Sequence, residues 1–292
     1  MSVGLGLPFC DPAQLLTWAR RADAAPFSTV ALPHRSAPGA PEPLLALAAL
    51  ASATSRIRLQ TELPLAPPHR APLLARQAAT LDALAGTRLT LGIGIGDAGP
   101  GTGSGGHAAE ELAALRGIRS GGATVLFGGG GPAVGERVAR YGDGFLSSTL
   151  PSPHLDRLFR DVEAAWSHAG RTGQPRLSAR VNVALGPPPT LDRARRELRA
   201  HAAPAAGPAH PTDGAEATDG AIGSSGSMGS ADHIVNGLLT SRDQIRDAVA
   251  GCMALGADEV LLRCWSPDPD QVGRIADAVF PPDGDWPGLT DD

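Results

Sequence analysis

The feature that most constrains the fold is a regular alternation of short apolar runs with longer stretches that have helical spacing. Each apolar run is bounded by turn residues and is followed by a segment rich in Ala, Leu and Arg. Alternation of this kind is typical of parallel strands connected by helices, in an open sheet or a closed barrel. We expect an α/β fold in which residues 1–292 form a single (β/α)8 TIM-barrel domain.

The alternation predicts the individual elements. The expected strands are Val3–Leu7, Thr29–Leu32, Arg58–Leu63, Arg88–Ile93, Thr124–Phe127, Gly144–Leu146, Leu177–Leu185 and Glu259–Arg263. The expected helices are Pro12–Ala25, Pro43–Thr54, Pro72–Leu84, Ala108–Arg116, Ala133–Tyr141, His154–Ala169, Leu191–His201 and Ser241–Leu255. Several begin with Pro or a capping residue, as at Asp11–Pro12 and Ser241, which is typical of helix N-termini.

Two segments depart from the pattern. The fourth helical unit, between Asp97 and Gly121, is shortened, because GPGTGSGG takes most of its length. The segment 202–232, after the seventh strand, lacks periodicity and is too poor in apolar residues to offset the cost of ordering. We expect 202–232 to be a disordered or mobile loop insertion; a lid that orders when a ligand binds is the alternative.

Composition excludes several classes of function. All 25 basic residues are Arg, which excludes enzymes that need a Schiff-base, P-loop or general-base lysine. The net charge of -5, with Arg interleaved among acids, argues against a nucleic-acid partner. No apolar run reaches the roughly 18 residues of a membrane span and the N-terminus lacks a signal-peptide pattern, so we expect a cytoplasmic protein with no membrane partner. The three cysteines lack metal-ligand spacing, so no metal site is expected, and the abundance of Ala, Arg, Gly and Pro is typical of a high-GC bacterium.

Three segments together carry a resemblance to a known superfamily. They are ASATSRIRLQTELPLAPPHRAPLLARQAATLDALAGTRLTLGIGIGD at 51–97, ATVLFGGGGPAVGERVARYGDGFL at 123–146 and LLTSRDQIRDAVAGCMALGADEVLLR at 238–263. In this order they resemble the luciferase-like flavin-dependent monooxygenases and deazaflavin-dependent oxidoreductases. The resemblance implies a TIM barrel of the bacterial-luciferase-like type.

Two glycine-rich strand ends are candidate cofactor contacts. At Gly128, Gly129, Gly130 and Gly131 a strand ends and a helix begins, so unhindered backbone N–H groups and the positive helix end can hold a phosphate, which FMN and the deazaflavin both carry. A plain flexible turn is the equal alternative. The GIGIGD segment, with Gly94, Gly96 and Asp97, permits a flat ring to approach the strand end closely.

Other strand ends supply the candidate catalytic residues. Thr61 matches a family position at the end of the third strand, whereas Glu62 stands where the family usually has a small residue beside the flavin ring. A carboxylate there can hydrogen-bond a ring N–H, act as a base or exclude the flavin. FSTVALPHRS, at 27–36, resembles the second strand and its active-site end, and it makes His34 a candidate proton donor or a solvent-facing loop residue. Arg263 ends the last strand and is a candidate phosphate contact or a packing residue.

The resemblance therefore implies an enzyme that uses reduced FMN, supplied by a flavin reductase, and O2 to oxygenate a small organic molecule. Hydride transfer with coenzyme F-420 is the first alternative. A degenerate, non-catalytic barrel that binds flavin or a partner protein is the second, motivated by Glu62, the all-glycine loop and the shortened fourth unit. A homodimer is also expected, since luciferase-like barrels often pair through helical faces.

Overall fold

The strands of the sheet close on themselves into a barrel. The computed structural model describes residues 2–34, 40–64, 71–94, 122–129, 133–147, 152–202 and 237–280. Eight parallel strands form the ring, in the order β1 (Ser2–Gly6), β2 (Thr29–Pro33), β3 (Arg58–Pro64), β4 (Leu89–Gly94), β5 (Thr124–Gly128), β6 (Gly144–Leu146), β7 (Arg176–Val183) and β9 (Glu259–Cys264). β6 pairs with β7, and β9 pairs with both β7 and β1, so the ring has no open edge. The predicted TIM barrel is confirmed.

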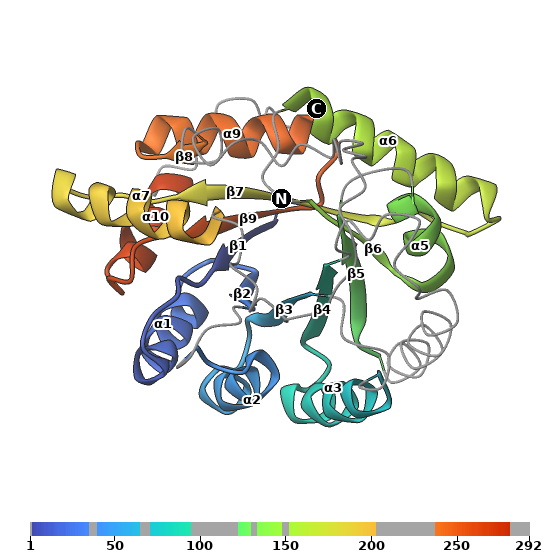
Figure 1. Ribbon diagram of the computed structural model, residues 1–292, viewed down its shortest axis with the longest axis horizontal. Helices are drawn as coiled ribbons and strands as arrows, with labels where there is room; N and C mark the ends of the chain where they lie inside the picture. Colours follow the sequence, from blue (N-terminus) through green and yellow to red (C-terminus); the bar gives the residue numbers. More distant parts are fainter. Residues whose placement is uncertain are drawn as a thin grey trace, which may run out of the picture.

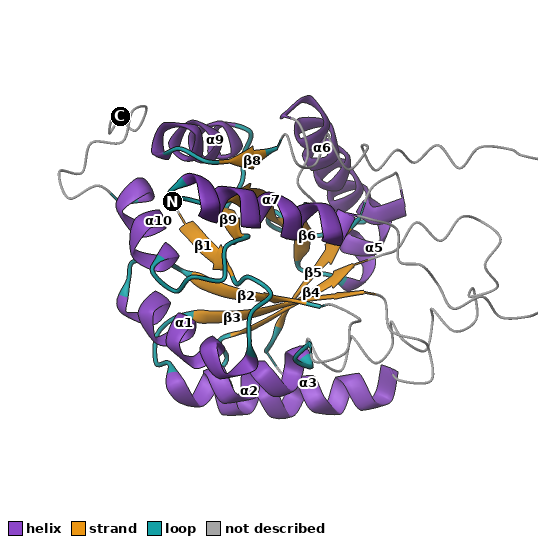
Figure 2. Cartoon of the chain, turned by 60° about the vertical axis from the view of Figure 1, so that its left-hand side comes forward, coloured by secondary structure: helices purple, strands orange, loops and turns teal. Residues whose placement is uncertain are grey.

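Helices surround this ring (Figures 1 and 2). Those described are α1 (Pro12–Ala24), α2 (Pro43–Ala53), α3 (Ala71–Ala85), α5 (Ala133–Tyr141), α6 (Ser152–His168), α7 (Pro188–Ala202), α9 (Arg242–Ala254) and α10 (Gln271–Val279). The predicted caps are present: the Asp11 side chain accepts a hydrogen bond from the Ala13 N–H, and Ser241 forms a capping box with Gln244. These caps satisfy donors that a helix N-terminus leaves without an intrahelical partner.

Two elements were not expected from the sequence. A two-residue strand, β8 (Leu238–Leu239), pairs with the end of β7, and α10 follows β9. α10 buries Val272, Ile275 and Val279, whose helical spacing is a signal in the sequence that only its short length obscures. The expected helix 108–116, the shortened fourth unit and nearly all of the expected loop insertion at 202–232 lie outside the described residues.

The two faces of each strand have different surroundings. On β1, Val3 and Leu5 belong to the large apolar core between strands and helices, while Gly4 and Gly6 occupy the alternate positions. A Cβ on Gly6 would lie 3.1 Å from the Cα of Arg263 on β9. Because side chains alternate along a strand, the second set of positions faces the barrel lumen. Here the lumen holds polar side chains as well as apolar ones.

At the N-terminal end of the barrel these side chains form an ionic cluster around Glu259. This carboxylate is 1% exposed and accepts hydrogen bonds from Ser28 (2.5 Å), Thr29 (2.6 Å) and the Arg176 guanidinium (2.9 Å). A fourth partner, Arg58, lies 3.8 Å away. Burial by itself would raise the pKa of Glu259, but the nearby Arg176 and the two hydroxyl hydrogen bonds outweigh it and hold that pKa below its usual value. The cluster joins four strand starts and the segment before β2, so we assign it a role in stability.

Replacing this carboxylate tests that assignment. Glu259→Gln is expected to lower the free energy of unfolding by about 3 kcal/mol, because it leaves buried guanidinium groups without their counter-charge. The measurement is urea unfolding at pH 7. The matched control is Glu163→Gln, which removes an exposed pair with Arg160 on α6 and is expected to cost less than about 1 kcal/mol. Equal losses in the two variants would contradict the assignment.

Candidate active site at the barrel mouth

A second ionic network crosses the opposite, C-terminal end of the lumen. The Glu62 carboxylate, near the end of β3, accepts hydrogen bonds from Arg180 of β7 at 2.6 Å and from Arg263 of β9 at 2.8 Å. β3 and β7 face each other across the barrel, because the ring runs from β3 to β7 through β4, β5 and β6 on one side and through β2, β1 and β9 on the other. Active sites of TIM barrels lie at this end.

The network leaves polar atoms without partners. The side chains of Arg263 and Glu62 are only 4% and 10% exposed, and that of Arg180 is 23% exposed. The second carboxylate oxygen of Glu62, Oε1, is buried and has no hydrogen-bond partner. Nε and Nη2 of Arg263 are in the same situation. Buried polar groups in native proteins are almost always hydrogen-bonded, so these unpaired atoms make the mouth a candidate ligand site.

Electrostatics fix the charge of this network. Burial acts to raise the pKa of Glu62, but Arg180 and Arg263 outweigh it and lower that pKa below the usual range. Burial lowers the pKa of Arg263 to about 10, although Glu62 acts in the opposite direction. At neutral pH the three groups are therefore one carboxylate and two guanidinium ions.

An aromatic group lies against Arg263. The rings of Phe9, which follows β1, and Trp265, which follows β9, lie 5.0 and 4.9 Å from the guanidinium carbon. The ring of His201, at the end of α7, is 5.3 Å from both aromatic rings. The Trp265 indole N–H donates to Asn182 at 2.8 Å. These contacts fix one wall of the mouth and cover Arg263.

Several members of this site were not expected from the sequence. Arg180, Phe9, His201 and Asn182 were not among the predicted residues. Arg180 and Asn182 did carry a signal, because β7 places Arg176, Ser178, Arg180 and Asn182 at every second position, as in a strand with one polar face. Phe9 and His201 lie just beyond a strand and at the end of a helix, where spacing carries no such signal.

The predicted residues fall in different places. Glu62 and Arg263 are brought together in the network. The His34 backbone N–H donates to the Glu62 carbonyl at 3.0 Å, so the half-buried His34 lies beside Glu62 at the end of β2. Thr61 is completely buried and alternates with Glu62 on β3, on the face that Leu59 presents to the apolar core. Its hydroxyl oxygen has no partner.

The predicted glycine contacts line the adjoining part of the mouth. Gly94 ends β4 and pairs in register with Gly128, which ends β5; Gly129 follows directly. A Cβ on Gly128 would lie 3.0 Å from the carbonyl oxygen of Leu146, so a side chain has little room there. The other predicted contacts, Gly96, Asp97, Gly130 and Gly131, lie outside the described residues.

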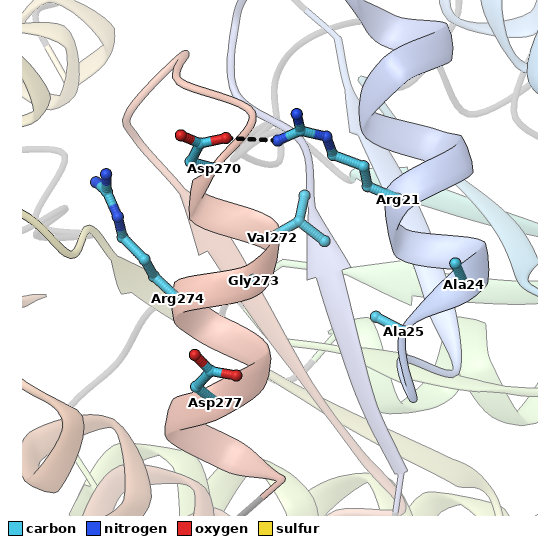
Figure 3. A pocket seen from close by; sticks show the side chains of 8 residues that line it. All are labelled: Arg21, Ala24, Ala25, Asp270, Val272, Gly273, Arg274 and Asp277. Atoms are coloured by element: carbon cyan, nitrogen blue, oxygen red, sulfur yellow. Dashed lines mark hydrogen bonds and ion pairs between the residues drawn. The ribbon is translucent and has the colours of Figure 1, made fainter.

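A hollow of about 510 Å³ on the outside of the barrel is separate from this site (Figure 3). It lies between α1 and α10, where Arg21 pairs with Asp270 at 2.7 Å, and it contains none of the predicted residues. Within the described ranges, no group of three or more His, Cys, Asp or Glu side chains is arranged to hold a metal ion. No described helix combines the length and apolar character that a bilayer crossing requires.

Comparisons with known proteins agree with the fold. A family model described as luciferase-like monooxygenase matches residues 4–117 and 119–259. No curated protein matches the chain. Among solved structures, an F-420-dependent secondary alcohol dehydrogenase in complex with an F-420–acetone adduct is similar, with a TM-score of 0.71 and 16% identity over 96% of this chain and 98% of that one.

Two monooxygenases are also similar. One, from Streptomyces bottropensis, has a TM-score of 0.62 and 16% identity over 95% of this chain and 98% of its own. The other, an EDTA monooxygenase from Chelativorans sp. BNC1, has a TM-score of 0.64 and 12% identity over 94% and 92%. At such identities these structures bear on the fold alone.

The ionised Glu62 makes the free energy of unfolding depend on pH. A group whose pKa is lowered on folding contributes stability that is present above its unfolded pKa and lost as the pH falls through its folded pKa. Glu62→Gln is therefore expected to cost about 3 kcal/mol of unfolding free energy at pH 7. The difference in unfolding free energy between the variant and the wild type should narrow below about pH 4, which is close to the pKa of a glutamate in an unfolded chain. Urea unfolding of both proteins from pH 3 to 7 measures this, and a difference that stays constant would contradict an ionised Glu62.

Proposed function

Because this chain belongs to the luciferase-like monooxygenase family, we propose that it is a flavin-dependent monooxygenase that uses reduced FMN and O2 to oxygenate a small organic molecule. The observation that carries the proposal is the Glu62–Arg180–Arg263 network at the barrel mouth, with a buried carboxylate oxygen that has no partner. When bound, reduced FMN supplies the electrons that activate O2, and the protein supplies position and electrostatics.

The residues of the mouth fit a flavin in two respects. Glu62 offers an unused acceptor, Oε1, which matches the ring N–H in the pyrimidine half of a flavin or deazaflavin. Gly94 and Gly128 leave the neighbouring strand ends without side chains, so a flat ring can lie against them. In this proposal Glu62 binds the ring edge, and Gly128 and Gly129, with the positive N-terminal end of α5, attract the phosphate.

The network gives Glu62 a binding role more than a proton-transfer role. Arg180 and Arg263 hold its pKa low, against the effect of burial, so it is a weak base at neutral pH but a strong hydrogen-bond acceptor. His34 lies beside it at the end of β2, and we assign proton donation to its imidazole, the side chain that most often serves as general acid in enzymes. Phe9 and Trp265 limit the access of water to Arg263.

A second candidate is hydride transfer with coenzyme F-420. It is supported by Glu62, whose free acceptor matches a deazaflavin equally well. The cofactor decides between the two reactions. A degenerate barrel is the alternative if neither cofactor binds.

The remaining parts of the proposal concern partners and compartment. A flavin reductase would supply reduced FMN. A homodimer through the helical faces is supported by Leu45 of α2 and by Leu73 and Leu84 of α3, which are large apolar side chains exposed by 69%, 53% and 65%. All three cysteines are free thiols, which is compatible with the reducing cytoplasm.

Cofactor binding tests the proposal directly. The purified chain, titrated anaerobically with reduced FMN and with F-420, is expected to bind reduced FMN in the micromolar range. Glu62→Met should weaken this binding about tenfold, because it removes a hydrogen bond to a charged acceptor worth roughly 1.5 kcal/mol. Glu163→Gln, on the surface of α6, is the control and should bind as the wild type does.

The other outcomes separate the alternatives. Binding of F-420 but not of FMN would replace the monooxygenase by the hydride-transfer enzyme. Turnover that persists without O2 would also contradict a monooxygenase. Binding of neither cofactor would leave the degenerate barrel, and equal FMN affinities of the wild type and Glu62→Met would remove Glu62 from the binding site.

A further inference from the structure

Arg263 has one edge of its guanidinium group occupied and the other unused. Nη1 donates to Glu62 at 2.8 Å, whereas Nε and Nη2, which form the adjacent edge, have no partner. The side chain is 4% exposed. A buried guanidinium with two unpaired donors is costly, so the unused edge has the character of a preformed binding site.

The ionic cluster around Glu259 has no buried guanidinium edge with two unpaired donors, so this feature is specific to the mouth. At the N-terminal end, Nε is the one buried guanidinium nitrogen without a partner on each of Arg58 and Arg176, and both carboxylate oxygens of Glu259 are bonded. At the mouth, Arg263 leaves two donors on one edge and Glu62 leaves one oxygen unpaired. Each network contains one carboxylate and two guanidinium groups. Only at the mouth do both the carboxylate and a guanidinium group have buried atoms without a hydrogen-bond partner.

The shape of the unused edge selects the ligand. Nε–H and Nη2–H point in parallel and match the two oxygens of a carboxylate, which is the bidentate geometry that Arg forms most strongly. The rings of Phe9 and Trp265 lie against the guanidinium group, so a ligand that reaches Arg263 must bind the unpaired edge. Phe9 is half-buried and offers an apolar surface to the part of a ligand that carries the carboxylate, whereas Trp265 is buried.

Charge favours the same ligand. Arg180 and Arg263 bring two positive charges, and Glu62 neutralises one of them. His201 is another titratable group at the mouth. It packs against the rings of Phe9 and Trp265 and acts to lower the pKa of Glu62. A monoanion therefore brings the network to neutrality without repelling it.

We propose that the Nε–Nη2 edge of Arg263 binds the carboxylate of the substrate, so that the substrate is an organic acid with an apolar or aromatic group next to its carboxylate. The assignment of this ligand as substrate rests on the proposed function, whereas the anion site itself does not require a bound cofactor. Arg180 and Glu62 position Arg263, and the half-buried Phe9 contacts the apolar part.

Calorimetric titration of the cofactor-free full chain tests the site with simple probes. Benzoate is expected to bind at least tenfold more tightly than benzamide, its neutral analogue, and more tightly than phenyl phosphate. Arg263→Lys keeps the positive charge but loses the planar guanidinium group that can form two parallel hydrogen bonds. This variant should bind benzoate at least tenfold more weakly. Arg21→Met, which removes an exposed guanidinium paired with Asp270, is the control and should bind benzoate as the wild type does.

A second variant gives an effect in the opposite direction. Glu62→Gln removes the internal negative charge but keeps an oxygen that can accept from Nη1 and position Arg263, so benzoate should bind severalfold more tightly and raise the melting temperature of this variant more than that of the wild type. This outcome does not depend on whether Arg263→Lys folds.

The contrary results are specific. Equal affinities for benzoate and benzamide, no binding of benzoate to the wild type, or unchanged binding in Arg263→Lys would overturn the proposal. Preference for phenyl phosphate would overturn the carboxylate class. Titrating the same preparations with reduced FMN and F-420 separates this result from the proposed function: benzoate selectivity without cofactor binding refutes the enzyme and retains the anion site, and the reverse result refutes the site alone.

Discussion

The interaction on which the mouth of this barrel depends is the contact of one carboxylate with two guanidinium ions across the lumen. Glu62 reaches from β3 to Arg180 on β7 and Arg263 on β9, and these strands are distant in sequence and opposite or nearly opposite in the ring. Isolated buried charges would be strongly unfavourable, so each of the three groups depends on the others. The network fixes where charge lies at the mouth and which atoms remain available to a ligand.

The lumen has two ionic ends with different consequences. Around Glu259 both carboxylate oxygens are bonded, and the cluster ties strand starts together. Around Glu62 one oxygen and one guanidinium edge are unpaired. In TIM barrels the N-terminal end serves stability and the C-terminal end serves function, and this chain has the same pair of residue types at both ends. What distinguishes the two ends is the unused bonding capacity and not the charge.

The fold could be predicted from the sequence because it depends on local patterns. Alternating apolar runs and helical stretches specified the barrel strands, and caps such as Ser241 specified helix starts. The site could be predicted only in part. Glu62 stood out as a carboxylate at a strand end, but its partner Arg180 is 118 positions away, and sequence spacing does not show which charges meet across a lumen. The aromatic cover of Phe9 and His201 likewise depends on how α7 packs.

In the proposed complex the free oxygen of Glu62 accepts a hydrogen bond from the ring of the flavin. The most direct measurement is the NMR chemical shift of the ring N3–H in ¹⁵N-labelled reduced FMN, bound to the wild type and to Glu62→Met. We expect a downfield shift in the wild type that is lost in the variant, because a carboxylate acceptor deshields the proton. Identical shifts in the two complexes would show that Glu62 does not touch the ring.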